Sequence, residues 1–411
     1  MNLLLLRRII LGMALLCASG LFAFAQGTAL GTQLDAVVRL SSNVLVGLTP
    51  TGALVRSVDN GTTFTQVRAT DIVTPPATRA LLTLAASNSV LIAAGDAGGF
   101  VRSTDGGVTW STLKYMTSPS FVGSIQGLAG NGNTTWVAVG VNNTKLTPLY
   151  STDSGVTWHL SPTIASPTGK LRSVVWSGQY WVAAGGNSGG GFVLRTTNPS
   201  TAWSLATVPS LDPFLYPQTQ IAPLSAVASN GSGLVLAVGE AGTLIYSADH
   251  GATFSDAGSG YVSDNLRAAL FVSGTQWAAA GDLGVVVTFD STVPGTVTVR
   301  QTPSPASETI SGLVSGSTAG TYLVATLSLT STAPQAITAS ISVVSNQLRV
   351  ELGGAVSGSS YFVEQSSDLV TWSAASGSTK TYGGVTALFW DFALPGGGSK
   401  SLYRIKLGST P

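Results

Sequence analysis

The sequence has little charge and few of the side chains that usually carry chemistry. Charged residues make up 9% of its 411 residues and the net charge is +1, whereas about a quarter of an ordinary soluble domain is charged. A nucleic-acid-binding protein needs a basic footprint, so this class is excluded. The single cysteine, Cys17, lies in an N-terminal apolar stretch, and there are two histidines. We therefore expect no disulfide, no metal site and no cofactor in the mature chain.

One apolar run of some length is present, at the N-terminus. Arg7 and Arg8 precede it, and Ala23-Phe24-Ala25 follows as a small-x-small cleavage site. The run from Ile9 to Phe24 is shorter than the roughly 20 residues of a membrane span. We expect residues 1–25 to be a signal peptide and the mature protein to be periplasmic, at the cell surface or secreted, with no transmembrane segment and with the Sec and twin-arginine routes both open.

Internal repetition organises most of the remaining chain. The octapeptide STDGGVTW starts at Ser103, STDSGVTW at Ser151, SVDNGTTF at Ser57 and SADHGATF at Ser247, with a weaker copy, TTNPSTAW, at Thr196. Each copy follows an alternating segment such as LIAAGDAG or LVLAVGEAG, a pattern typical of strands joined by tight turns. A period of 40 to 50 residues with strand patterning predicts propeller blades.

A third motif opens each unit and sets the number of blades. It reads LDAVV, LLTLA, IQGLA, LRSVV, LSAVA, LRAAL and ISGLV, and its third residue is always small. Innermost propeller strands converge on the axis and need small side chains there. We predict an all-β β-propeller of seven blades, with six as the alternative, over residues 26–340, closed by an N-terminal strand near residues 26–33.

The octapeptides resemble the Asp-box, or BNR, repeat. The fuller phrase, with its A-x-G-[DE]-x-G segment, is similar to the propellers of photosystem II stability and assembly factors and their bacterial relatives. The resemblance covers residues 33 to 335 and implies a propeller fold. It does not by itself imply a photosynthetic role or sialidase activity.

Residues 341–411 differ in character. SYFVEQSSDLVTWSAA, ALFWDFALP and SLYRIKL give short alternating strands between glycine-rich turns. We predict a small C-terminal β-sandwich of immunoglobulin or fibronectin type, which resembles a module of exported bacterial proteins.

The repeated aspartates have a structural interpretation. Asp59, Asp105, Asp153 and Asp249 precede an aromatic residue in a turn, where a short carboxylate can accept backbone N–H groups. The glycine two positions on permits positive φ, and the tryptophans would pack between blades. Binding of calcium or another ligand is the alternative, and we assign no site to these residues.

The opposite face of the propeller is the better candidate for binding. It would carry Asp96, Glu240 and Asp282 at the turns between second and third strands, and the residue after each opening Leu or Ile. Six of those seven residues are polar, and they would form a ring at the channel mouth. The candidate binding residues in it are Asp35, Gln126, Arg172 and Arg267. The alternative is that the arginines only satisfy nearby carboxylates or carbonyl groups.

Three connections expected on this face contain aromatic residues. Residues 204–223 hold Phe214 and Tyr216, which we take as further candidate binding residues. Residues 111–123 hold Tyr115 and Phe121, and residues 255–264 hold Tyr261. Long loops on a rigid scaffold tend to carry binding, although such aromatics can equally cover the edge of a propeller.

The sequence does not hold a complete catalytic set. Sialidases contain a repeat that resembles this one, and their catalysis needs three arginines, an acid/base aspartate and a tyrosine–glutamate pair. In this sequence, Arg172 and Arg267 are the only arginines at matching ring positions. We predict a non-catalytic, exported and monomeric binding or assembly module that engages a protein or a glycan. The alternatives are a sialidase-like glycoside hydrolase and a surface adhesin.

Overall fold

The computed structural model is built of β-strands and short 3-10 turns. It describes residues 26–326, except 31, 74–77, 80, 117–122, 142–145, 212–220, 293–296, 302–308 and 318–320, and, beyond these, the strands that lie between 338 and 407. The chain divides into two compact units, one of residues 1–299 and 304–331 and one of residues 300–303 and 332–411. The predicted signal peptide, residues 1–25, lies outside the described residues.

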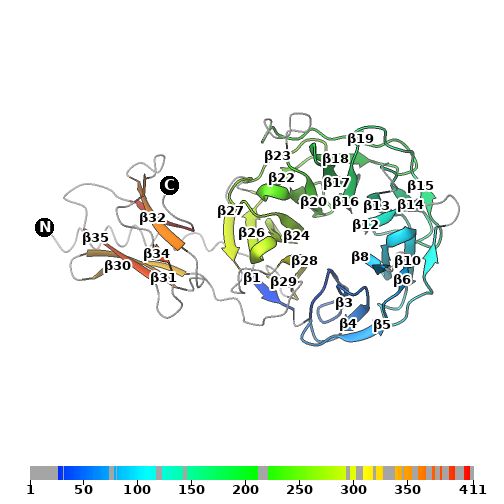
Figure 1. Ribbon diagram of the computed structural model, residues 1–411, viewed down its shortest axis with the longest axis horizontal. Coiled ribbons are helices and arrows are strands. Elements are labelled where there is room, and N and C mark those ends of the chain that lie inside the picture. Colours follow the sequence, from blue (N-terminus) through cyan, green and yellow to red (C-terminus); the bar gives the residue numbers. More distant parts are fainter. Residues whose placement is uncertain are drawn as a thin grey trace. The chain divides into compact units, whose positions relative to one another are not determined.

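The first unit is a ring of seven sheets (Figure 1). Six of them are four-stranded antiparallel sheets whose strands follow chain order, and the seventh has three strands. The first strand of each sheet contacts the first strands of its two neighbours, β28 and β2 included. The first strands therefore line the axis, and the fourth strands lie at the outer rim. The predicted all-β propeller is confirmed, with seven blades in the ring rather than the alternative six.

The blades begin and end as follows. Blade 1 has β2 (Ala36–Arg39), β3 (Leu45–Leu48), β4 (Leu54–Ser57) and β5 (Thr65–Arg68); blade 2 has β8 (Leu81–Ser87), β9 (Val90–Gly95), β10 (Gly99–Ser103) and β11 (Lys114–Tyr115); blade 3 has β12 (Ser124–Gly130), β13 (Trp136–Val141), β14 (Leu149–Ser151) and β15 (His159–Leu160). A two-stranded sheet of β6 (Ile72–Val73) and β7 (Thr78–Arg79) lies between blades 1 and 2 in the chain.

The later blades have the same plan. Blade 4 has β16 (Lys170–Trp176), β17 (Trp181–Asn187), β18 (Gly190–Thr196) and β19 (Ser204–Leu205); blade 5 has β20 (Leu224–Ser229), β21 (Val235–Gly239), β22 (Leu244–Ser247) and β23 (Ser255–Asp256); blade 6 has β24 (Leu266–Ser273), β25 (Gln276–Gly281), β26 (Val285–Asp290) and β27 (Val297–Gln301). Parts of the connections expected at 111–123, 204–223 and 255–264 are thus the short fourth strands β11, β19 and β23.

The ring is closed by the two ends of the propeller sequence. Blade 7 has β28 (Ile310–Ser315) and β29 (Thr321–Thr326), and β1 (Gln26–Ala29) pairs with β29 in parallel, with Gln26 opposite Thr321 and Ala29 opposite Val324. Leu30 N–H continues the pairing by donating to the Val324 carbonyl at 2.9 Å. The predicted closing strand is confirmed.

The core of this unit lies between blades. Trp136, Trp181 and Trp277 on the second strands are among its largest fully buried side chains. The aromatic residue that ends each octapeptide packs with the preceding blade: Trp158 joins Ile92 and Phe100 of blade 2. In the same way, Trp110 of blade 2 packs against blade 1, and Trp203 of blade 4 packs against blade 3. The expected packing of these tryptophans between blades is confirmed.

The second unit contains two further antiparallel sheets. One has the order β30 (Thr338–Val344), β31 (Gln347–Gly353) and β35 (Leu388–Ala393). In the other, β32 (Ser360–Ser366) pairs with β33 (Ser373–Ala374), β34 (Lys380–Thr381) and β36 (Leu402–Leu407). These sheets carry the alternating segments from which the C-terminal sandwich was predicted.

Candidate functional site

The predicted ring residues occupy a special backbone position. In blades 2 to 7 the first strand is out of register with the second by one residue at this point, as between Leu171 and Ser173 or between Leu266 and Ala268. The residue that is skipped is the ring residue: Leu82, Gln126, Arg172, Ser225, Arg267 and Ser311. A β-bulge leaves one residue outside the ladder and re-aims its side chain. The repeat thus presents one position outside the ladder in each of blades 2 to 7, at the same end of the ring.

Three carboxylates follow the second strands at this end. Asp96, Glu240 and Asp282 begin the 3-10 turns η1 (Asp96–Gly98), η2 (Glu240–Gly242) and η3 (Asp282–Gly284). The middle residue of each turn has a left-handed backbone, with φ of 53°, 51° and 55°. The turn is then completed by a glycine of positive φ, which is why a glycine stands two positions after each of these acidic residues. We call the surface formed by these turns and the ring residues the ring face.

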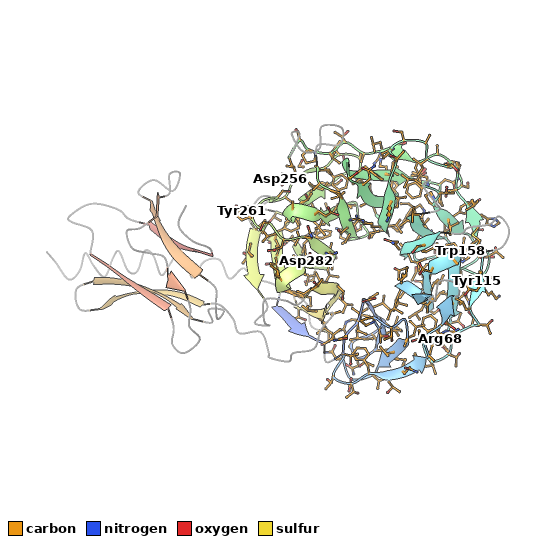
Figure 2. The ribbon with its side chains drawn as sticks, viewed as in Figure 1. Arg68, Tyr115, Trp158, Asp256, Tyr261 and Asp282 are labelled. Carbon is orange, nitrogen blue, oxygen red and sulfur yellow. The ribbon has the colours of Figure 1, made fainter. Side chains whose placement is uncertain are left out.

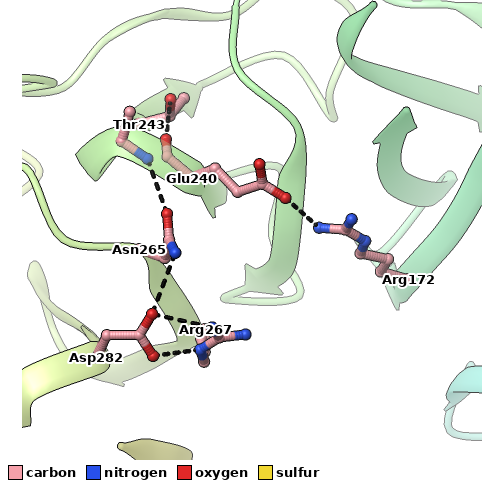
Figure 3. Close-up of polar contacts among 7 residues, drawn as sticks. Arg172, Glu240, Thr243, Asn265, Arg267 and Asp282 are labelled. Carbon is pink, nitrogen blue, oxygen red and sulfur yellow. Dashed lines mark hydrogen bonds and ion pairs between the residues drawn. The ribbon is translucent and has the colours of Figure 1, made fainter. Parts of the chain in front are cut away.

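Two ion pairs join ring arginines to turn carboxylates (Figure 3). Arg172 of blade 4 reaches across to blade 5, where its Nη1 lies 3.0 Å from Glu240 Oε1. Arg267 pairs within blade 6, using Nε for Asp282 Oδ1 and Nη2 for Asp282 Oδ2, the latter at 2.9 Å. The side chains of Arg172 and Glu240 are 30% and 38% exposed. The predicted alternative, in which the arginines satisfy nearby carboxylates, thus describes the contacts seen, while the pairs stay open to solvent.

Asn265 links the two pairs. Its Nδ2 donates to Asp282 Oδ2 at 3.1 Å, and its Oδ1 accepts from the backbone N–H of Ala241, beside Glu240, also at 3.1 Å. Hydrogen bonding from Arg267 lowers the pKa of Asp282 and outweighs partial burial, which acts in the opposite sense. Asp282 is therefore held as a carboxylate. The network runs over blades 4, 5 and 6 and fixes the turns that carry it.

A pocket of about 580 Å³ opens beside the Arg172–Glu240 pair. Its polar lining comes from the start of β16, the turn after β17 and η2. These residues are Thr168, Lys170, Arg172, Asn187, Ser188 and Glu240. Lys170 is exposed, and Asn187 is held by a 2.7 Å bond from its Nδ2 to the Thr168 carbonyl. One carboxylate against two cations gives the pocket a positive balance.

The structure brings together only part of the predicted site. Arg172 lines the pocket and Arg267 belongs to the neighbouring network. Asp35 lies in blade 1, where its backbone N–H donates to Leu48 at 2.7 Å, and Gln126 is an exposed residue of β12 in blade 3. Phe214 and Tyr216 lie outside the described residues. Lys170 and Asn187 were not predicted, although Lys170 stands only two positions before Arg172 in the sequence.

The carboxylate of each aspartate turn is hydrogen-bonded within its own turn. The aspartate turns are Ser57–Phe64, Ser103–Trp110, Ser151–Trp158 and Ser247–Phe254. In the second, Asp105 Oδ1 accepts from the Ser103 hydroxyl at 2.8 Å and from the Val108 and Thr109 N–H groups at 3.1 and 3.0 Å. Hydrogen bonding from the Thr109 hydroxyl, above all, lowers the pKa of Asp105 to about 2. The structural interpretation of these aspartates is thus confirmed by their contacts.

The described residues contain no group of three or more His, Cys, Asp or Glu side chains placed to hold a metal ion. Nor does that part of the chain contain a helix with the length and apolarity to cross a membrane.

Comparison with known proteins shows the fold. YCF48 from Cyanidioschyzon merolae superposes with a TM-score of 0.51 at 18% identity, over 69% of this chain and 89% of that one. The WD40 repeats of RRP9 give 0.51 at 10% identity, over 79% of this chain and 88% of that one. A structure of YCF48 bound to a D1 peptide gives 0.48 at 17% identity, over 67% and 82% of the two chains. No protein-family model and no curated protein sequence matches the chain.

Proposed function

We propose that the chain is an exported, non-catalytic β-propeller that binds a protein or a glycan through the pocket on its ring face. The observation that supports this most is the pocket itself, because it opens at the bulge residue Arg172 and beside a solvent-exposed ion pair. Ligand sites are concave and present a few convergent polar groups. The propeller supplies both on a rigid scaffold.

The two arginines of the network differ in what they still offer to a ligand. Arg267 uses Nε and Nη2 on one carboxylate, whereas Arg172 touches Glu240 through Nη1 alone. A guanidinium carries five N–H donors in a fork that matches a carboxylate or a pair of hydroxyl groups. Arg172 and the exposed Lys170 are therefore the residues that would meet an anionic or polyhydroxylated group of the ligand.

The pairing of the carboxylates argues against catalysis. Glycoside hydrolysis needs two placed carboxyl groups, one of which is a proton donor. The pocket lining holds one carboxylate, Glu240, and that is paired with Arg172. The next along the network, Asp282, has a lowered pKa, so it stays ionised and has no proton to donate near neutral pH. These contacts support a binding role.

The experiment compares Arg172→Gln and Lys170→Glu with the wild type. Arg195→Gln is the matched control, because Arg195 lies in the same blade but faces the aspartate turn of blade 5. There its Nη1 lies 3.2 Å from the Asp249 carbonyl. Each protein is used to capture ligands from a native envelope extract and is applied to a glycan array. We expect a ligand that is retained by the wild type and Arg195→Gln and lost by both pocket variants.

Two results would overturn the proposal. One is a ligand that both pocket variants retain as well as the wild type does. The other is turnover of a fluorogenic sialoside by the wild type that Glu240→Gln abolishes, which would make this pocket a catalytic site.

A further inference from the structure

A second pocket, of about 410 Å³, lies at the rim between blades 2 and 3. Its two walls are β11 with the following residue, 114–116, and the end of the blade 3 aspartate turn, 155–158. Figure 2 places Tyr115 and Trp158 together on this side of the ring, across from Asp282. We call this pocket the rim groove. It shares no residue with the ring-face pocket.

The equivalent walls are joined directly between blades 4 and 5. There the chain leaves β19 and Thr207 pairs in parallel with Thr253 of the aspartate turn. Thr207 N–H donates to the Ala252 carbonyl at 2.9 Å, and Phe254 N–H donates to the Thr207 carbonyl at 2.8 Å. The neighbouring Ala206 is buried, and Val208 packs against the same core. Between blades 4 and 5, the extended backbone at Thr207 thus takes up the Ala252 carbonyl and the Phe254 N–H at the end of the aspartate turn.

Between blades 2 and 3 the same backbone groups are left facing the groove. Met116 N–H donates to the Gly98 carbonyl at 3.3 Å, so the backbone of Tyr115, one residue earlier, points away from β10, as that of Thr207 points away from β18. By position in the octapeptide, Val156 and Trp158 correspond to Ala252 and Phe254. Among the described residues of blades 2 and 3, no backbone hydrogen bond joins β11 to this turn.

The side chains of the groove are apolar and cationic. Tyr115 is 41% and Val156 56% exposed, and Trp158 stacks on Phe100 with ring centroids 4.4 Å apart. The charged lining residues are Lys114, which is exposed, and Arg102. The lining contains no carboxylate, so the groove favours a negatively charged occupant that also has apolar side chains.

We propose that the rim groove binds an extended segment of a partner protein as an added β-strand, with an acidic side chain of the segment at Lys114 and apolar side chains over Tyr115 and Val156. Strand addition uses backbone hydrogen bonds for affinity and side-chain pockets for specificity. The Ala206–Val208 segment is this chain's own example of an extended backbone that pairs with an aspartate turn at the rim. The proposal does not depend on the ring-face pocket.

The probe is a phage library of random dodecapeptides, selected on the intact chain and counter-selected on Val156→Glu. Val108→Glu is the matched control, because Val108 has the same place in the blade 2 turn and is 53% exposed. Tyr115→Pro removes the N–H that faces the groove, and proline is tolerated on edge strands. Affinities of the resynthesised peptides are read by fluorescence anisotropy, and strand formation is read by amide hydrogen exchange.

We expect acidic peptides with alternating apolar residues whose affinity falls at least tenfold in Val156→Glu, falls in Tyr115→Pro and changes less than twofold in Val108→Glu. Lys114→Glu should weaken the same peptides, and a peptide with lysine in place of its acidic residue should recover the loss. The Tyr115 and Trp158 amides should become protected. Selection of no peptide that depends on Val156, or binding without that protection, would overturn the proposal, as would a glycan that bound the groove in place of peptides.

Discussion

Arg102 of blade 2 donates a hydrogen bond from Nε to the carbonyl oxygen of Ser154, 2.7 Å away in the aspartate turn of blade 3. The same contact joins Arg56 to Gly106 at 2.9 Å and, through Nη1, Arg195 to Asp249 at 3.2 Å. In each case an arginine that precedes the Ser or Thr of its own octapeptide binds the turn of the next blade. The repeat therefore encodes a contact between blades as well as a turn within one.

Arg56→Gln should lower the free energy of unfolding by about 1–2 kcal/mol, because it removes a partly buried charged donor from a carbonyl group. Arg195→Gln should have a smaller effect, since its hydrogen bond is longer and exposed. Urea titration followed by tryptophan fluorescence measures both. Equal losses in the two variants would mean that the contact between blades contributes nothing beyond the loss of charge.

The aspartate turns should make the propeller sensitive to acid. Asp59 and Asp105 have pKa values of about 2 through hydrogen bonding, mainly from Thr63 and Thr109, and Asp153 and Asp249 reach about 2 because such bonds outweigh their partial burial. A pKa lowered by folding stabilises the protein above the unfolded value, near 4, and this stability is lost as pH falls through the folded value. Thermal midpoints should therefore fall between pH 4 and pH 2.

Asp153→Asn provides the check on that acid sensitivity. The variant should be less stable than the wild type at pH 7 and should lose less stability between pH 4 and pH 2, because one of the titrating groups has been removed. Circular dichroism melts across this range give the comparison. Parallel pH profiles for variant and wild type would show that other carboxylates carry the acid sensitivity.

Gly155→Ala should destabilise the propeller by about 2–4 kcal/mol. Gly155 has a φ of +79°, and an added Cβ would lie 2.2 Å from Ile92 Cδ1 in the preceding blade, so that backbone strain and overpacking act together. Gly132→Ala is the control, since Gly132 has a φ of +80° with nothing within 4 Å of the added Cβ. It should cost about 1–2 kcal/mol. Chemical denaturation of both proteins separates the two contributions.

Removal of residues 26–30 should loosen blade 7 more than any other blade. The deletion takes away β1 and the Leu30 N–H bond to Val324, and it exposes the edge of β29. Hydrogen exchange should accelerate in β28 and β29 first, and limited proteolysis should cut the chain there. Unchanged protection of β29 would show that the ring is held shut without its N-terminal strand.

The fold could be predicted in detail because its repeat is local. The opening leucine or isoleucine, the alternating second strand and the aspartate turn each specify a neighbouring piece of the same blade, and Ala36 or Gly127 at the third position marks the crowded axis. The positions of the short outer strands could not be predicted, because two residues such as Lys114–Tyr115 give no period to detect.

The site was predictable only in part because it depends on distance across blades. The ring position of Arg172 follows from the repeat, but its partner, Glu240, lies in the next blade and is identified only by the three-dimensional structure. Lys170 and Asn187 come to the same pocket because β16 pairs with β17, with Lys170 opposite Gly186. The rim groove follows from a difference between two blade boundaries, at Tyr115 and at Thr207, that the octapeptides themselves do not show.

The parallel pairing of β1 with β29 also governs when the protein can finish folding. Gln26 begins the described chain and Thr321 stands near the end of the propeller, so the first described strand to be synthesised has to wait for almost the last strand of the ring. Blades 1 to 6 can assemble by local hairpin formation, but the closing contact joins residues very distant in sequence, the kind of contact that slows folding. A chain interrupted before residue 321 lacks β29, so blades 1 and 6 each keep a face that the complete blade 7 would cover.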